Sequence, residues 1–258
     1  MKKLINVLLT INYLGTFYSG WQKQNNKKTI QSELESVFSK IFNQNIEIIG
    51  SGRTDAGVHA QNAKANAVLP LEFLQKHFSK QGKIDFSKLI NSVNQLLPED
   101  IKILHIKKVN LQFNARFAAK KKTYLYKIQS GGILSPIDSL NTVFINQNLD
   151  LNKMIQASKY LIGEHDFTSF CSAKTETESK VRTIFDIKIN KRGKFINFEI
   201  TGNGFLYNMI RIIVGTLVEV GYGKLEPIEV KNILGAKNRK NAGKTMPAKG
   251  LTLKTVKY

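Results

Sequence analysis

The stretch GSGRTDAG, from Gly50 to Gly57, is the most informative part of this chain. Three glycines surround one base and one acid, and glycine permits positive φ angles and a close approach of other backbone. The carboxylate of Asp55 on such a turn can be presented to a ligand. The alternative is an ordinary Asx turn, in which Asp55 binds its own backbone. A Walker loop is excluded because no Gly-Lys-Ser/Thr follows, and an EF-hand is excluded because the further carboxylates are absent.

Outward from this turn, the hydrophobic pattern predicts an α+β protein with mainly antiparallel sheets. Alternating apolar residues predict a first strand that ends near Tyr13, and Thr29 opens a helical pattern that continues to Phe42. Size suggests two domains, residues 1–108 and 109–258. Further strands are expected at Ile46–Ile49, Ile101–Val109, Thr123–Ile128, Phe185–Ile189, Phe195–Thr201 and Leu253–Tyr258, and further helices in parts of 70–97, over Leu151–Ile162 and over Phe205–Val220.

The charge of the chain indicates a polyanionic partner. The 258 residues include 39 Lys and Arg against 19 Asp and Glu, which is a formal charge of +20, while a hydrophobic content of 42% excludes disorder. Two blocks, Ile101–Ile137 and Val230–Tyr258, contain eight bases each and no acid. Such blocks favour a phosphate-binding surface over the alternative of many merely solvated lysines, so we expect nucleic-acid binding.

Several classes of protein are excluded. A single cysteine, Cys171, rules out an internal disulfide and a cysteine-based zinc site, and it fits a reducing cytosol. The histidines show no metal-ligand spacing, so no metal site is expected. No apolar stretch reaches the ~18 residues of a membrane span, and no small-residue cleavage site follows the apolar N-terminal segment.

Two further segments carry candidate residues. Arg211 is the charged residue of the apolar stretch Phe205–Val218, which predicts a largely buried helix. Because an unpaired buried charge costs several kcal/mol, Arg211 needs an anionic partner, which could be Asp55, another acid, or solvent reached by snorkelling. Tyr124 and Tyr126 share one face of a strand beside three lysines. Such a tyrosine could stack on a nucleobase or simply pack in the sheet.

A series of short motifs runs along the chain in a fixed order. The longest is GRTDAGVHA at residues 52–60. It is joined by GWQKQ at 20–24, LLPEDI at 96–101, ARF at 115–117, KTYLY at 122–126, DFTSF at 166–170, GFLYNMIR at 204–211 and PAKGL at 247–251. This ordered set resembles the tRNA pseudouridine synthase A family over nearly the whole chain. The chain departs from the family pattern at Leu14, at Asn114 and at 62–67, where NAKANA replaces a strand of the form GQVxxF and Ala67 replaces the aromatic.

The resemblance implies an enzyme. It implies a pseudouridine synthase fold of two α/β subdomains with the active-site cleft between them. It also implies an isomerase that converts uridine to pseudouridine at tRNA positions 38, 39 and 40, in the anticodon stem-loop. Asp55 would be the nucleophile, Arg211 would pair with Asp55, and Tyr124 would contact the target uracil. The order in which bonds are made stays open.

The resemblance also implies the surroundings of the reaction. Arg53 would touch the RNA backbone or occupy the space of the flipped base, Leu251 would pack near the uracil, and Arg116 and Phe205 would bind substrate. No cofactor and no metal are implied, and the expected protein is a cytoplasmic homodimer that binds tRNA. Two alternatives remain: an RNA-binding protein without catalysis, and a paralogue that acts on another RNA because of its altered segment 62–67.

Overall fold

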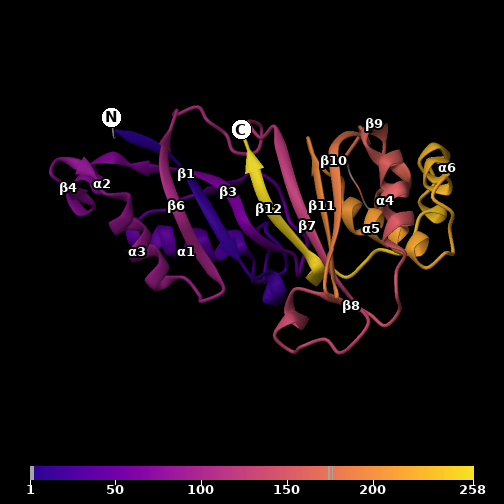
Figure 1. Ribbon diagram of the computed structural model, residues 1–258. Helices are drawn as coiled ribbons and strands as arrows, with labels where there is room; N and C mark the ends of the chain where they lie inside the picture. Colours follow the sequence, from indigo (N-terminus) through magenta and orange to yellow (C-terminus); the bar gives the residue numbers. More distant parts are fainter. Residues whose placement is uncertain (1–2, 174, 176) are drawn as a thin grey trace. The chain divides into compact units, whose positions relative to one another are not determined.

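The computed structural model describes residues 3–173, 175 and 177–258, and it divides into two compact units. Unit 1 runs to Ala119 and includes Tyr258, whose ring packs edge-on against Phe113 at 5.0 Å between centroids. Unit 2 spans Lys120–Lys257. Each unit combines a mainly antiparallel sheet with helices (Figure 1). The predicted α+β class is therefore confirmed.

The sheet of unit 1 is built around its first strand. β1 (Leu4–Tyr13) lies between β3 (His59–Pro70) and β6 (Ile101–Val109), and it is antiparallel to both. The short strand β2 (Ile48–Gly50) pairs with β3. The expected strand over Ile46–Ile49 therefore begins two residues later. The altered segment 62–67 keeps the strand conformation, because it lies inside β3.

The helices of unit 1 begin where the sequence provides caps. α1 (Ile30–Phe42) starts after Thr29, whose side chain accepts a hydrogen bond from the Ser32 backbone in a capping box. The helical segments expected within 70–97 are α2 (Leu71–His77) and α3 (Phe86–Leu96), and α3 ends two residues before Pro98. A small hairpin of β4 (Ser79–Lys80) and β5 (Lys83–Ile84) separates them.

The sheet of unit 2 has a tyrosine-bearing strand near its centre. β7 lies between β11 and β12, β10 follows β11, and β9 forms the far edge. β8 pairs in parallel with the last residues of β7. The bounds are Lys121–Ser130 for β7, Val143–Ile145 for β8, Gly163–Asp166 for β9, Val181–Arg192 for β10, Phe195–Gly202 for β11 and Leu251–Lys257 for β12.

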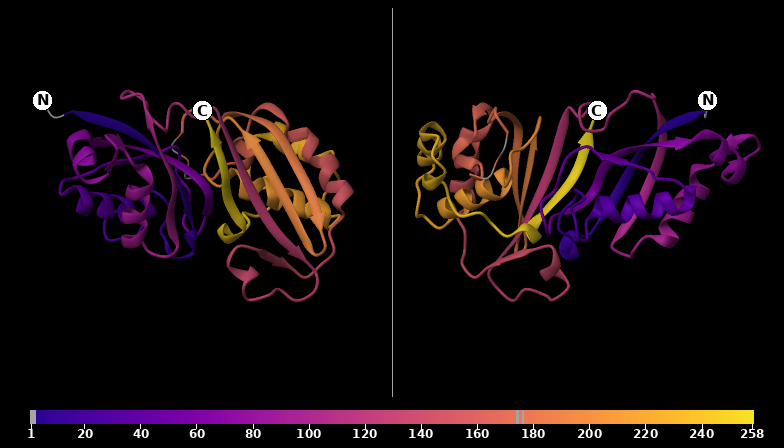
Figure 2. Two further views of the ribbon diagram at one scale, coloured as in Figure 1. Left: turned by 60° about the vertical axis from the view of Figure 1, so that its left-hand side comes forward. Right: turned by 180° about the vertical axis from the view of Figure 1, so that it is seen from behind.

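The helices of unit 2 correct two predictions. α5 (Met209–Gly221) begins four residues after the expected Phe205, because Asn208 has a left-handed backbone with φ of 61° and interrupts the helical conformation. α4 (Leu151–Ser158) ends before the expected Ile162 and continues as a 3₁₀ turn, Lys159–Leu161. α6 (Glu229–Ala236) was not anticipated. Figures 1 and 2 show these helices gathered on one face of the unit 2 strands.

Short 3₁₀ turns complete both units, and one of them directly precedes Leu251 at the start of β12. They are η1 (Gly15–Phe17), η2 (Asp138–Leu140), η4 (Thr168–Phe170), η5 (Arg239–Asn241) and η6 (Ala248–Gly250).

Candidate active site

The turn that carries Asp55 joins β2 to β3 in unit 1 and is held by backbone hydrogen bonds on both sides. The Thr54 carbonyl accepts from the Trp21 amide at 3.0 Å, and the Asp55 carbonyl accepts from the Val58 amide at 3.1 Å. Gly57 has a φ of 77°, which an L side chain rarely adopts. The Asp55 side chain is half-buried. The main chain that carries Asp55 is therefore held in one conformation.

The segment around Gly20 packs against this turn so closely that only glycine fits at that position. Gly20 has a φ of +93°, and a Cβ placed there would lie 2.6 Å from the Thr54 carbonyl oxygen. Real Cβ atoms essentially never approach another atom so closely. The GWQKQ motif thus contributes a backbone that closes over the residue preceding Asp55.

Two buried side chains, those of Tyr13 and His59, connect the turn and the start of β3 to the end of β1 and to Gly15, which follows it. The Tyr13 hydroxyl and Thr54 Oγ1 are 2.8 Å apart, and burial raises the pKa of Tyr13 far above its usual value. His59 Nδ1 accepts from the Gly15 amide at 2.9 Å, and His59 is buried. His59 therefore has a structural role at the end of the GRTDAGVHA motif, while Arg53 stays exposed.

Unit 2 brings Tyr124 and Phe205 together. The two rings pack edge-to-face, with centroids 5.4 Å apart, and Tyr124 is 8% exposed. On β12, Leu253 lies opposite Tyr124 and Leu251 lies opposite Tyr126. Three predicted substrate-contacting residues thus come from three separate stretches of sequence.

Tyr126 is a structural tyrosine. It is fully buried, its hydroxyl donates to the Pro247 carbonyl at 2.7 Å, and burial raises its pKa. A Cβ on Gly250 would lie 2.6 Å from Cζ of the Tyr126 ring. The ring therefore holds the PAKGL turn, which delivers Leu251 to the start of β12. Of the two tyrosines that share a strand face, Tyr126 fits the packing alternative.

Arg211 is less buried than its helix predicts. Within α5 every residue is buried except Arg211 and Glu219, which are partly exposed. Arg211 Nε donates to the Met246 carbonyl at 2.6 Å, and Nη1 donates to Asn208 Oδ1 at 2.7 Å. Two of its five N–H donors therefore bind neutral oxygens, which satisfies part of the guanidinium without an acid. The pairing of Arg211 with Asp55 stays a prediction.

Arg116 lies exposed on the loop that follows β6. Its guanidinium carbon is 5.7 Å from the centroid of the Phe117 ring, and Phe117 is 79% exposed. A buried pair, Asn6 and Asn66, holds this loop. Asn6 Nδ2 donates toward the carbonyls of residues 110, 111 and 113. Asn66 Nδ2 donates to Asn6 Oδ1, and Asn66 Oδ1 accepts from the backbone amide of Ala115.

Sequence reasoning missed this asparagine pair, although a signal for it exists. Asn6 interrupts a strand of apolar residues, and a buried amide in a sheet must have hydrogen-bond partners. The partners, however, lie about a hundred positions away in the chain, so their identity could not be inferred from Asn6 alone.

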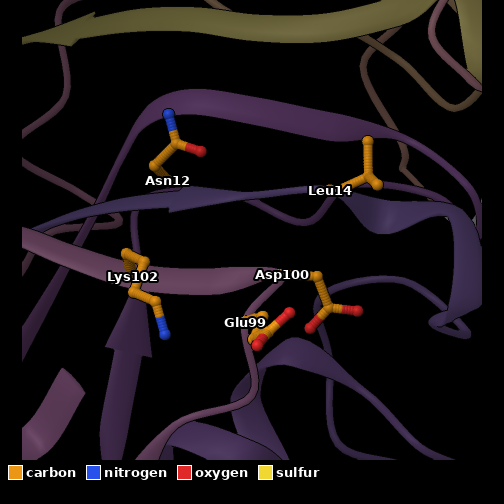
Figure 3. A pocket seen from close by; sticks show the side chains of 5 residues that line it. All are labelled: Asn12, Leu14, Glu99, Asp100 and Lys102. Atoms are coloured by element: carbon orange, nitrogen blue, oxygen red, sulfur yellow. The ribbon is translucent and has the colours of Figure 1, made fainter. Parts of the chain in front are cut away.

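A pocket of about 310 Å³ lies elsewhere in unit 1 (Figure 3). Its polar lining is engaged in the fold: Asp100 Oδ1 accepts from the Tyr18 hydroxyl at 2.5 Å, and Lys102 Nζ donates to the carbonyls of Asn94 and Pro98. None of the sequence-predicted site residues lines it, so we do not place the active site there. The lining residues are Asn12, Leu14, Glu99, Asp100 and Lys102.

The sequence-predicted site residues are divided between the two units. Arg53, Asp55 and Arg116 belong to unit 1, and the others, Tyr124, Phe205, Arg211 and Leu251, belong to unit 2. Among the described residues no group of three or more His, Cys, Asp or Glu side chains could hold a metal ion. Within the same part of the chain no helix has the length and apolar character needed to span a membrane.

Comparison with known sequences gives matches along most of the chain. The family model described as tRNA pseudouridine synthase matches residues 9–118 and 157–258, which include every predicted site residue except Tyr124. A protein named tRNA pseudouridine synthase A from Caldicellulosiruptor saccharolyticus is 45% identical over 253 residues, which is 98% of this chain and 99% of that relative. A protein of the same name from Brevibacillus brevis is 43% identical over 258 residues, covering both chains completely.

Among solved structures, one match is titled Crystal Structure of a Cbf5-Nop10-Gar1 Complex. It is 12% identical, has a TM-score of 0.37, and covers 99% of this chain and 58% of that chain. Because a score of this size reflects only a partial overlap of backbones, the assignment to a family rests on the sequences.

Proposed function

Because this chain belongs to the tRNA pseudouridine synthase family, we propose that it converts uridine to pseudouridine at positions 38, 39 and 40 in the anticodon stem-loop of tRNA. The observation that carries the proposal is the Asp55 turn. A half-buried carboxylate sits on a backbone held by hydrogen bonds before and after it, within the longest family-like motif of the chain. Because the main chain of this turn is held in place, the carboxylate that it carries has little freedom to move away from a bound substrate.

The proposed reaction is an isomerisation and balances without a second substrate. The bond from the ribose C1′ to N1 of uracil breaks, and a bond from C1′ to C5 forms. C5 loses a proton and N1 gains one, so no electrons, atoms or energy source are added, and neither a cofactor nor a metal is needed. Breaking the glycosidic bond develops positive character on the sugar, which a carboxylate can stabilise or trap, as in retaining glycosidases.

Asp55 is the proposed nucleophile. It could attack the sugar carbon, add to the base, or remove a proton, and each of these routes requires the ionised carboxylate. A guanidinium near the carboxylate would favour that form, which is the role proposed for Arg211. The hydrogen bonds from Arg211 to Met246 and Asn208 support a fixed guanidinium, since two of its N–H groups are already anchored.

Tyr124, Phe205 and Leu251 are proposed to contact the uracil. The edge-to-face packing of Tyr124 on Phe205, together with the position of Leu251 at the start of β12, supports an apolar wall built from three segments. A uridine inside a stem must leave its stack before any side chain can reach it, at a cost of a few kcal/mol. A wall of aromatic and aliphatic side chains would offset part of that cost.

Arg53 and Arg116 are proposed to contact the RNA. Both side chains are exposed, and the overall charge of +20 favours association with a polyanion. We also propose that the enzyme acts in the cytoplasm as a homodimer, as its family resemblance implies. The buried single thiol, Cys171, suits a reducing compartment. The mass of the free protein in solution, measured by light scattering, tests the dimer.

The proposed activity is tested by mapping pseudouridine in unmodified tRNA after incubation with the protein. The wild type should convert uridines in the anticodon stem-loop, and Asp55→Asn should lower the rate by at least about 1000-fold because the nucleophile is lost. Asp186→Asn provides a matched control, since this partly exposed aspartate of β10 lies 3.5 Å from Lys188 and outside the site. Binding of tRNA should change little in either variant.

Two results would contradict the proposal in different ways. Tight tRNA binding by the wild type with no pseudouridine formed would favour an RNA-binding protein without catalysis. Pseudouridine formed in another RNA but not in the anticodon stem-loop would favour the paralogue.

A further inference from the structure

The two faces of the unit 1 sheet differ in composition, although both are buried along most of β1. On β1 the odd-numbered residues from Ile5 to Ile11 are buried and apolar, and they lie opposite buried β3 residues from Leu69 back to Ala63. The intervening positions form the second face. The altered segment NAKANA is therefore divided: its alanines belong to the apolar face, and Lys64 and Asn66 belong to the second face.

Lys64 is held on this second face by a specific contact. It lies opposite Thr10 in the β1–β3 register, and its Nζ donates to Thr10 Oγ1 at 2.6 Å. The lysine is only partly exposed, and Thr10 is buried. Its ammonium group is thus fixed near the sheet, whereas most lysines extend freely into water.

A second lysine reaches the same region from the other side of β1. Lys107 on β6 lies opposite Leu8, which is the next residue of β1 on this face after Thr10. Burial lowers the pKa of Lys64, and the charge of Lys107 lowers it further. The two ammonium groups therefore repel each other across the strand.

Neither lysine makes an ion pair with any acid among the described residues. Other partly buried or exposed lysines do, such as Lys23 with Glu35 and Lys127 with Asp138, each at 3.1 Å. Lys107 also belongs to the acid-free block Ile101–Ile137. Two like charges without a counter-charge are unfavourable in the free protein, and an anion bound between them would remove that penalty.

We propose that Lys64 and Lys107 bind a phosphodiester of the tRNA backbone on the second face of the unit 1 sheet. This inference rests on the proposed tRNA substrate and adds a contact outside the predicted site residues. A phosphodiester suits the pair because it carries one negative charge and oxygens that accept from several ammonium groups. Arg116 and its asparagine-held loop cover the neighbouring part of the same face, where Asn6 and Asn66 lie.

Edge protection is the competing explanation for these lysines. In unit 1, β6 pairs with β1 along one side, and lysines on such an outer strand discourage pairing with other chains. This accounts for an exposed Lys107. It does not account for Lys64, which lies on an inner strand, is partly buried, and is fixed to Thr10.

The test compares charge-removing substitutions at matched positions. Lys64→Gln and Lys107→Gln should each weaken tRNA binding by about 3- to 10-fold and should each reduce the slope of log K against log salt by about 1. Lys64→Arg should restore most of the affinity. Lys40→Gln on α1 and Lys88→Gln on α3 remove the same charge from exposed positions of unit 1 and should change affinity less than about 2-fold.

Stability of the free protein provides a second measurement. Since Lys107→Gln removes the repelling charge while the Lys64–Thr10 hydrogen bond stays, its melting temperature without RNA should equal or exceed that of the wild type. A lower melting temperature would contradict the geometry described above.

The possible failures are distinguishable. If the wild type forms pseudouridine, and both glutamine variants keep wild-type affinity and salt dependence, the phosphate site is wrong while the proposed function stands. If the wild type neither binds nor modifies tRNA, both proposals are wrong. Equal losses in the Lys40 and Lys88 controls would show only a general charge effect and would also refute the site.

Discussion

The Asp55 turn of unit 1 and the tyrosine–arginine group of unit 2 are built by different means. Backbone hydrogen bonds and glycines position Asp55, with partners such as Trp21 and Gly20 that approach through main-chain atoms. Side-chain packing and side-chain hydrogen bonds position Tyr124 and Arg211. The position of Asp55 is therefore sensitive to backbone conformation, whereas the unit 2 group is sensitive to the identity of individual side chains.

Within the unit 2 group, the strongest effect is expected when the guanidinium of Arg211 is removed. Arg211→Met should lower the rate of pseudouridine formation by about 100-fold or more while tRNA affinity falls less than about 5-fold, if Arg211 serves the chemistry of Asp55. Arg211→Lys keeps the charge and loses the two anchored contacts, so it should be intermediate. Single-turnover rates measured beside tRNA affinity separate the two effects. A folded, fully active Arg211→Met enzyme would refute the proposed role.

The backbone of unit 1 can be tested at Gly20. Gly20→Ala forces a Cβ toward the Thr54 carbonyl at a positive φ, so it should lower the free energy of unfolding by about 2–4 kcal/mol and reduce activity in the molecules that remain folded. Gly235→Ala is the control, because this glycine of α6 has no atom near its Cβ position and should tolerate alanine. Chemical denaturation of both variants provides the measurement. Equal stability of the two would contradict the close approach at Gly20.

Substitutions at the two tyrosines of β7 should affect stability and the chemical rate to different degrees. Tyr126→Phe leaves the Pro247 carbonyl without its donor and should cost about 1–2 kcal/mol of stability with little change in the chemical rate. Tyr124→Leu should lower the rate more than it lowers stability. Denaturation and single-turnover assays on both variants test this contrast. It fails if Tyr126→Phe is the variant that loses catalysis.

The smallest effect is expected at Asp166, in the DFTSF motif. The Thr168 hydroxyl, together with the Thr168 amide and Lys237, holds the pKa of Asp166 below its usual value. A lowered folded-state pKa adds stability above the unfolded pKa, and that stability is lost as pH falls through the folded pKa. Asp166→Asn should therefore melt below the wild type at pH 7, and the difference should shrink below about pH 4. A pH-independent difference would show that the ionised carboxylate is not responsible.

Local signals predicted much of this fold. The alternation in β1 and the cap at Thr29 indicated a strand and a helix close to their observed bounds, because both depend on near neighbours in the chain. The start of α5 was missed because Phe205 to Tyr207 continue an apolar pattern, whereas the left-handed backbone of Asn208 prevents the helix from beginning before Met209. α6 was missed because its eight residues are too few for a helical repeat of apolar positions to be recognised.

The amino-acid sequence by itself determined the Asp55 turn, the basic blocks and the family, because glycine geometry and charge are properties of neighbouring residues and the order of motifs is read directly along the chain. Only the tertiary structure decided that Tyr126 is the structural tyrosine, that Arg211 binds Met246 and Asn208, and that Lys64 approaches Lys107. The contacts of Tyr126 with Pro247, of Arg211 with Met246 and of Lys64 with Lys107 join segments that are distant in sequence. Long-range pairing alone sets which polar groups are buried together and which hydrogen bonds they make.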